Sequence, residues 1–304
     1  MNAPRGRPHE RFRAAQRHLT LGGLGPLDLD LAYTDTGDGD PVLLLHGIPT
    51  WSFLYHDVIP RLAGHCRVLA PDFLGHGYSD RRDRFDRSLV AQTAAILSFL
   101  DALEIERATW VGHDTGGGVA LIAAIEHPER VERLVLSNVV AYDSWPTGGM
   151  IELGDPTWRD RDAREIAEFV SSGFPEGIHN KDRLTDGFEA GILAPYADDE
   201  GKLSLIRNAS ALNTNHTMAL VDRHRDVRAP TLVLWGVHDP WQTIADGERL
   251  AVEIPGARLA RVEASHWIPQ DAPEDFADGV IAFLREPPRV RSTSPARRPP
   301  QADD

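Results

Sequence analysis

A glycine-rich segment, Gly112-His113-Asp114-Thr115-Gly116, restricts the possible folds of this chain more than any other feature. It follows a run typical of a strand, RATWV, and precedes an apolar run, residues 119–125, that is long enough for a helix. A sharp turn between a strand and a helix crowds any nearby Cβ atom, so glycines are needed on both sides of it. The segment therefore predicts a nucleophile elbow with Asp114 at its apex.

The central residue of this elbow is an aspartate, whereas the commonest version has a serine. A serine must lose a proton before it attacks, but a carboxylate is already an anion at neutral pH. Attack of Asp114 on an ester carbonyl would give an anhydride, while attack on a saturated carbon gives an ordinary alkyl ester. The aspartate therefore favours displacement at a C–halogen or epoxide C–O bond. The alternative is a glycine-rich turn in which Asp114 only caps the helix.

Composition and charge restrict the partners and the location of the protein. The 304 residues are 41% hydrophobic and carry a net charge of −14, which argues against a nucleic-acid or anionic-membrane partner. A single cysteine, Cys66, excludes an internal disulfide and fits a reducing compartment. No apolar run approaches the roughly 18 residues of a membrane span, and no apolar segment follows the N-terminal arginines. We expect a cytoplasmic protein with a small-molecule substrate; the sequence carries no signal of oligomeric state.

Runs typical of strands alternate with runs typical of helices along most of the chain, which predicts an α/β fold. HLTL and LDLDLAY form an expected hairpin, and a helix is expected from Ser52. Five apolar runs, VLLL, CRVLAPD, RATWV, VERLVLSNV and PTLVLWG, read as strands of a mostly parallel sheet flanked by helices. ARLARVEA reads as a last strand, followed by the helix EDFADGVIAFLRE.

The alternation is interrupted between residues 140 and 227, where pieces typical of helices replace the buried strands. We therefore predict a core over residues 17–139 and 228–286, with a helical cap inserted over 140–227. The N-terminal arm, 1–16, and the tail, 287–304, carry Arg, Pro and Ser without periodicity and are predicted to be disordered.

Two residues follow the late strands where catalytic partners of Asp114 are expected. Asp239 comes after PTLVLWG, and His266 comes after ARLARVEA. The chain order of nucleophile, acid and histidine is the order of Ser…Asp/Glu…His triads on such sheets. His266 would take a proton from water, and Asp239 would orient the imidazole. Taken singly, His266 could be an ordinary loop histidine and Asp239 a turn residue before Pro240.

The loop after VLLL supplies a fourth part of the expected site. The backbone N–H groups of Ile48 and Thr115 should converge on an anion, as in an oxyanion or leaving-group hole. The alternative is a plain connection between a strand and a helix. No metal-ligand spacing is found, so neither a metal nor another cofactor is expected.

Five segments together resemble a known family: HGIPTWSFLYHDVIP, PDFLGHGYSD, GHDTGG, the residues around Asp239, and SHWIPQDAPE. They are similar to the haloalkane dehalogenase and epoxide hydrolase branch of the α/β-hydrolase fold superfamily, and HGIPTWSFLY is closer to the dehalogenases. The resemblance implies Asp114 as nucleophile, His266 as general base and Asp239 as acid. Some dehalogenases carry the acid after the preceding strand, where this chain has Asn138.

The chain departs from this family at the positions that recognise substrate. Thr115 stands where dehalogenases usually have a halide-binding Trp, and Ile48 stands where many have Asn or Glu. Ile206 occupies the place of a lid tyrosine of epoxide hydrolases, and the insertion has only Tyr142 and Tyr196. Fluoroacetate dehalogenases have arginines beside the nucleophile, at positions that are Thr115 and Gly118 here.

The pocket residues are harder to select, because tryptophans and polar clusters are more often packed or solvated than functional. We name Trp158, Asn213, His216 and Trp267 as possible pocket residues. The prediction is a hydrolase that cleaves a C–halogen bond through an ester on Asp114. Alternatives are an epoxide hydrolase, an ester or lactone hydrolase, and a non-catalytic ligand-binding protein on the same fold.

Overall fold

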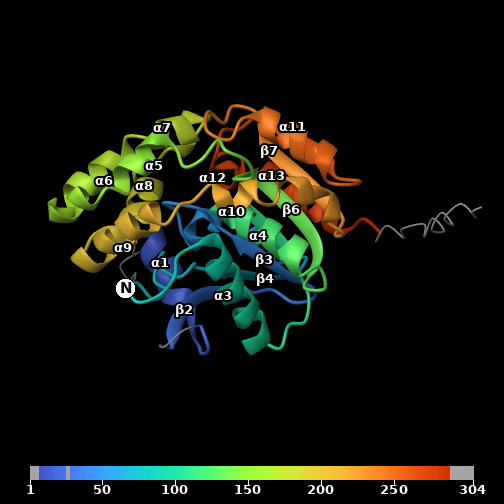
Figure 1. Cartoon of the computed structure of the whole chain (residues 1–304), viewed down its shortest axis with the longest axis horizontal. Coiled ribbons are helices and arrows are strands. Elements are labelled where there is room, and N and C mark those ends of the chain that lie inside the picture. Colours follow the sequence, from blue (N-terminus) through green and yellow to red (C-terminus); the bar gives the residue numbers. More distant parts are fainter. Residues whose placement is uncertain (1–6, 25–27, 288–304) are drawn as a thin grey trace, which may run out of the picture.

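One sheet of eight strands organises the computed structural model, which describes residues 7–24 and 28–287 (Figure 1). The spatial order is β1-β2-β4-β3-β5-β6-β7-β8. The strands are β1 (Arg17–Leu21), β2 (Leu29–Thr36), β3 (Pro41–Leu45), β4 (Arg67–Pro71), β5 (Ala108–Asp114), β6 (Val131–Val139), β7 (Thr231–Gly236) and β8 (Arg258–Val262). The β1–β2 and β2–β4 pairs are antiparallel and the others are parallel. The predicted α/β fold and the N-terminal hairpin are confirmed.

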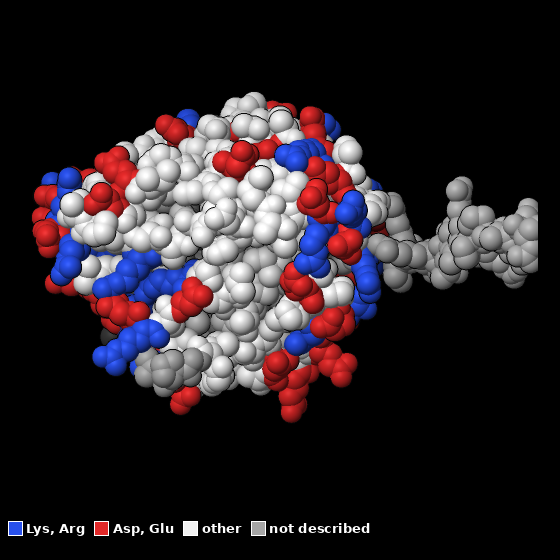
Figure 2. All heavy atoms as spheres, viewed as in Figure 1, with Lys and Arg blue, Asp and Glu red and all other residues white. Residues whose placement is uncertain are grey.

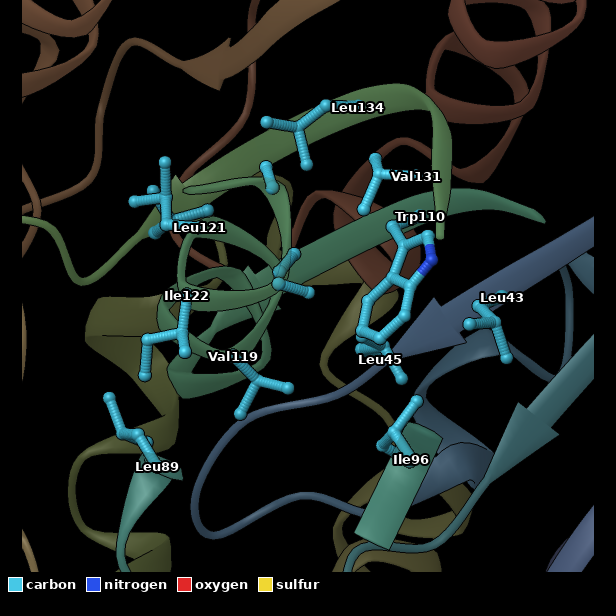
Figure 3. Packing of buried hydrophobic residues seen from close by; sticks show 14 of the residues in the cluster. Leu43, Leu45, Leu89, Ile96, Trp110, Val119, Leu121, Ile122, Val131 and Leu134 are labelled. Carbon is cyan, nitrogen blue, oxygen red and sulfur yellow. The ribbon is translucent and has the colours of Figure 1, made fainter. Parts of the chain in front are cut away.

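Strand periodicity divides the core between the two faces of the sheet, because successive side chains on a strand point to opposite sides. In β3, Leu43 and Leu45 join one hydrophobic cluster and Val42 and Leu44 join the other. The first cluster contains side chains of α3 (Leu89–Ala102), α4 (Thr115–Glu126) and α11 (Ile244–Glu253). Figure 3 shows Trp110 of β5 between Leu43 and Val131, with Val119 of α4 nearby. The second contains side chains of α2 (Ile59–Leu62) and α13 (Pro273–Leu284).

Short helices connect β6 to β7, and we call them the inserted helices. They are α5 (Gly148–Leu153), η2 (Pro156–Asp160), α6 (Ala163–Ser171), α7 (Phe174–Gly177), η3 (Lys181–Arg183), α8 (Asp186–Leu193), η4 (Ala194–Tyr196), α9 (Asp199–Ser210), α10 (Asn215–Met218) and η5 (Val221–Asp226). Side-chain N-caps at Thr147, Asp162, Thr185 and Asp198 begin α5, α6, α8 and α9. In Figure 1, α5 to α9 gather at one end of the molecule.

Two local expectations from the sequence are wrong. The arm over residues 1–16 was expected to be disordered, but Pro8–Ala15 forms helix α1. Composition could not reveal its partners: the ring of Phe12 lies 5.5 Å from that of Trp51 and 5.6 Å from that of Phe53. The helix expected from Ser52 is only one 3-10 turn, η1 (Ser52–Tyr55). Residues 1–6 and 288–304 of the two predicted disordered termini lie outside the described residues.

Charged side chains of both signs lie on the visible surface (Figure 2), as expected from a sequence that contains many acidic and many basic residues. In Figure 2, acidic and basic side chains alternate along the edges of the visible face, and its middle carries few of either sign. Among residues 7–24 and 28–287, no helix has the length and apolar character needed to cross a membrane.

Candidate active site

Asp114 lies at a strained turn between β5 and α4. Its φ is +51°, a value that residues with a side chain seldom adopt. Residues with such strained backbone conformations are concentrated at functional sites. A Cβ at Gly112 would collide with the backbone of α4, and one at Gly116 would collide with the carbonyls at the end of β3. The two glycines are therefore required by close packing, and the predicted strand, turn and helix are present.

Backbone donors converge on the Asp114 carboxylate. The N–H of Ile48 donates to Oδ1 at 3.0 Å, and the N–H of Thr115 donates to the same carboxylate. Gly47 allows this approach, because a Cβ there would overlap the carboxylate itself. The two N–H groups selected from the sequence thus meet at one place, and Asp114 occupies it.

His266 lies between the two carboxylates. Its Nδ1 is 2.8 Å from Oδ2 of Asp239, and its Nε2 is 3.8 Å from Oδ2 of Asp114. All three residues are at most 7% exposed. The hydrogen bond to Asp239 leaves Nε2 to face Asp114. The structure therefore brings together the three residues expected to carry the chemistry.

The carboxylate of Asp239 is held on every side. Its Oδ1 accepts the backbone N–H groups of Trp241 and Gln242, at 2.8 and 3.1 Å. Its Oδ2 accepts the side-chain N–H of Asn138 at 2.7 Å in addition to the bond with His266. These four contacts fix the position of the carboxylate, as a buried anion requires.

Asn138 is a supporting residue whose contact the sequence could not reveal. Its Oδ1 accepts the N–H of Gly236 at 2.8 Å, so its amide links the ends of β6 and β7. Asp271 is another such residue: its carboxylate accepts the N–H groups of Ser265, His179 and Asn180. It ties the loop of His266 to the inserted helices. The sequence signals for Asn138 are its place at the end of a predicted strand and its match to the position where some dehalogenases carry the acid.

Burial and charge shift the titration of the two facing groups. Burial raises the pKa of Asp114, although the charge of His266 and the N–H groups of Thr115 and Ile48 offset part of that shift. Burial acts to lower the pKa of His266. The charge and hydrogen bond of Asp239, with the charge of Asp114, outweigh it, and the pKa is raised.

A cavity of about 440 Å³ opens over these residues. Asp114, Thr115, Ile48 and His266 line one part of it. Much of the rest is apolar. The segment between β6 and β7 contributes Val140, Trp145, Pro146, Met150, Phe169, Val170, Phe174 and Leu212, and the loops after β7 and β8 contribute Trp241 and Trp267. No lysine, arginine or tyrosine is among the described residues that line it.

Of the four possible pocket residues named from the sequence, only Trp267 lines the cavity. Trp158 instead packs against Phe169, with ring centroids 4.6 Å apart. Asn213 accepts the N–H of Asn215 through its side chain, and His216 lies on α10 outside the lining. Trp158, Asn213 and His216 are therefore not among the described residues that line this cavity.

Neither tyrosine of residues 140–227 is among the described residues that line this cavity. The hydroxyl of Tyr142 donates to Glu253, and Tyr196 is not among the lining residues. In the part of the chain that the structure describes, no group of three or more His, Cys, Asp or Glu side chains could hold a metal ion. Gln242 lines the cavity and went unnoticed in the sequence, although it lies three residues after Asp239.

Comparison with known proteins agrees with this geometry. A model of the alpha/beta hydrolase fold family matches residues 40–273. Haloalkane dehalogenase 1 of Mycobacterium bovis is 31% identical over 278 residues, which cover 87% of this chain and 90% of that protein. Haloalkane dehalogenase 2 of Mycobacterium tuberculosis is 29% identical, covering 82% and 89%.

A solved structure extends the match to three dimensions. An alpha/beta hydrolase fold protein from Burkholderia ambifaria superposes with a TM-score of 0.78 at 26% identity, covering 88% of this chain and 99% of that one. The strand order, the match to the family model and the dehalogenase relatives all indicate the same fold family. The chain belongs to the alpha/beta hydrolase fold family, and it is a hydrolase related to the haloalkane dehalogenases.

Proposed function

We propose that this hydrolase cleaves a carbon–halogen bond through an alkyl ester formed on Asp114. The observation that carries the proposal is a carboxylate at the elbow, with Oδ1 held by the N–H of Ile48 and Oδ2 facing His266. Such a carboxylate needs no base before it attacks. The names of the dehalogenase relatives support the same substrate class.

Two balanced steps make up the proposed reaction. Oδ2 of Asp114 attacks the carbon that bears the halogen, the O–C bond forms, and the halide leaves with the bonding electron pair. His266 then takes a proton from water, which attacks Cγ of the ester. The charge that develops on the former carbonyl oxygen is stabilised by the N–H groups of Ile48 and Thr115. Loss of the alkoxy group, protonated by His266, gives the alcohol and leaves Asp114 as a carboxylic acid. Asp114 then releases the second proton of the attacking water to solvent, which restores the carboxylate.

Asp239 acts through His266 in this scheme. Its bond to Nδ1 keeps the unprotonated Nε2 toward the water and stabilises the imidazolium that forms. We also propose that residues 140–227 act as a cap over a core of residues 17–139 and 228–286. In support, the cavity is lined both by Asp114 and His266 and by Trp145, Met150 and Phe169 of the segment between β6 and β7.

Epoxide opening is the second candidate. The residues that line the cavity support it less well than they support C–halogen cleavage. The oxygen of an opening epoxide must gain a proton, and no tyrosine is among the described lining residues. Ester or lactone hydrolysis would need an anhydride on Asp114. A non-catalytic binding protein has no use for a histidine held between two buried carboxylates.

An isotope experiment tests the ester intermediate. In a single turnover with excess enzyme in H₂¹⁸O, we expect an unlabelled alcohol and one heavy oxygen in the peptide that contains Asp114. The water attacks Cγ, so the product keeps the original Oδ2 of the aspartate. A halogenated alkane is the substrate, and mass spectrometry of the alcohol and the peptide is the measurement. A labelled alcohol in the first turnover would mean direct attack of water and would overturn the proposal.

The pH dependence of turnover follows from the raised pKa of His266. Protonated imidazole cannot accept a proton from water, so the hydrolysis step is lost as the pH falls through that pKa. We expect an acidic limb in the kcat profile at the pKa of His266 in the ester, where Asp239 still raises that pKa and the esterified Asp114 no longer does. The halide burst, which needs only the Asp114 anion, should persist to lower pH. A kcat profile without an acidic limb, in a protein that still gives the halide burst, would contradict the assigned role.

A further inference from the structure

The proposed reaction needs a group that stabilises the departing halide, and several donors of the cavity are already in use. The N–H groups of Ile48 and Thr115 donate to Asp114. The indole N–H of Trp145 donates to Thr217, and the hydroxyl of Ser172 donates to the carbonyl of Phe169. No cationic lysine or arginine is among the described lining residues. A neutral donor without a partner is therefore required. The indole N–H of Trp267 is one such donor, and it serves as the competing candidate in the test below.

Gln242 meets this requirement. The residue lines the cavity and is only 2% exposed. Its Oε1 is buried without a hydrogen-bond partner, and among the described residues no hydrogen bond is found for Nε2, the donor of the amide. Rotation of the terminal amide exchanges its oxygen and nitrogen, so it can present either group to a ligand. Leaving a buried amide unpaired is unfavourable, and a ligand that pairs with it removes this penalty.

The backbone of Gln242 is held rigidly. Its N–H donates to Oδ1 of Asp239 at 3.1 Å, and its carbonyl accepts the indole N–H of Trp235 at 2.9 Å. The same segment thus fixes the acid of the triad and one side of the cavity. A donor on a fixed backbone needs little reorganisation when charge develops beside it.

We propose that the side-chain amide of Gln242 donates a hydrogen bond to the departing halogen atom and selects halide as the leaving group. The inference rests on the proposed function. As Oδ2 of Asp114 bonds to carbon, the C–X electron pair moves to the halogen, and the amide N–H stabilises that growing charge. A neutral amide cannot supply a proton, so it assists a halide, which leaves as an anion, better than an epoxide oxygen.

The test compares leaving groups in the His266→Gln background, where formation of the ester is observed alone. The probes are 1-chloro-, 1-bromo- and 1-iodobutane, and the measurement is the single-turnover rate of adduct formation on Asp114. We expect Gln242→Met to slow the chloride about 10- to 100-fold, as for a lost hydrogen bond to a charged group. The loss should be smaller for bromide and smallest for iodide, because the larger anions accept hydrogen bonds less strongly.

Stability separates this role from a structural one. Because the amide has no partner in the folded protein, Gln242→Met should not lower the melting temperature. Gln270→Met is the matched control: Gln270 is also buried with an unpaired Oε1, but its side-chain N–H donates to Arg183, and it does not line the cavity. It should lower the melting temperature without any dependence on the halogen.

The possible results of these measurements distinguish the role of Gln242 from the ester mechanism on which it rests. An equal loss of rate for all three halogens, or no loss, would overturn the role of Gln242. The same role would be overturned if Trp267→Phe, which removes another buried, unpaired N–H beside the cavity, showed the halogen dependence instead. If no adduct forms with any halide while Gln242 is intact, the ester mechanism itself fails, and that failure is distinguishable from the other two.

Discussion

Replacing Asp114 with asparagine is expected to abolish halide release, with a loss in kcat on the order of 10⁴-fold or more. The amide keeps the size of the side chain and can still accept the N–H of Ile48 through its oxygen. Its nitrogen, however, carries no negative charge and cannot displace a halide. Steady-state halide release and mass spectrometry of the Asp114 peptide check the result, and no adduct should form at any time.

The same substitution should leave the fold intact and raise its stability. A carboxyl whose pKa in the folded protein lies above its unfolded value destabilises the fold once the pH exceeds both values. The pKa of Asp114 is raised, chiefly by burial, so near neutral pH its charge opposes folding. Removing that charge should therefore raise the melting temperature. Residues kept for function often lower the stability of the fold, and their replacement then stabilises it.

A control separates this effect from a general effect of losing an acid. Asp160 lies on the exposed helix η2, and its side chain is 87% exposed. Asp160→Asn should change neither activity nor melting temperature. A variant at Asp114 that loses activity together with its cooperative unfolding transition would show a structural role instead. Substantial halide release by a folded Asp114→Asn variant would exclude it as the nucleophile.

The parts of the site that could be predicted from the sequence are those set by local rules. Glycines at 112 and 116 around a strand-to-helix turn define the elbow, because the turn leaves no space for other side chains. Asp239 and His266 follow successive strands of a parallel sheet. The carboxyl ends of such strands share one edge, so these residues had to lie near Asp114.

The remaining parts depend on packing between distant segments. Asn138 reaches Asp239 only because β6 lies beside β7 in the sheet. Trp158 was a plausible pocket wall, but the inserted helices direct it onto Phe169. Gln242 drew no attention because a single glutamine in a loop has no periodic or motif signal. Its unpaired amide is visible only once all of its neighbours are in place.

Replacing His266 with glutamine is the second substitution expected to have a large effect, and it should separate the two chemical steps. Attack by Asp114 needs no base, whereas hydrolysis of the ester does. We therefore expect kcat to fall about 10²- to 10⁴-fold, the range for loss of a general base, while one equivalent of halide per enzyme is still released.

The intermediate should then accumulate to visible amounts. Mass spectrometry of the intact His266→Gln protein should show the added mass of the alkyl group, and peptide mapping should place it on Asp114. Folding should persist, because Asp239 retains the N–H groups of Asn138, Trp241 and Gln242. The mass gained also identifies the substrate class: an alkyl group from a haloalkane, or a hydroxyalkyl group from an epoxide.

His216→Gln is the matched control, because His216 lies on α10 outside the cavity lining. It should turn over normally and show no adduct. If His266→Gln loses both the halide burst and turnover while it remains folded, the histidine is needed before the nucleophile attacks. The site would then work as a serine-type triad does, with the base activating the nucleophile, and attack by a preformed aspartate anion would be wrong. The halide burst depends on Asp114, whereas turnover depends on His266. A single variant that keeps the burst and loses turnover is therefore the most specific result expected of a carboxylate at the elbow.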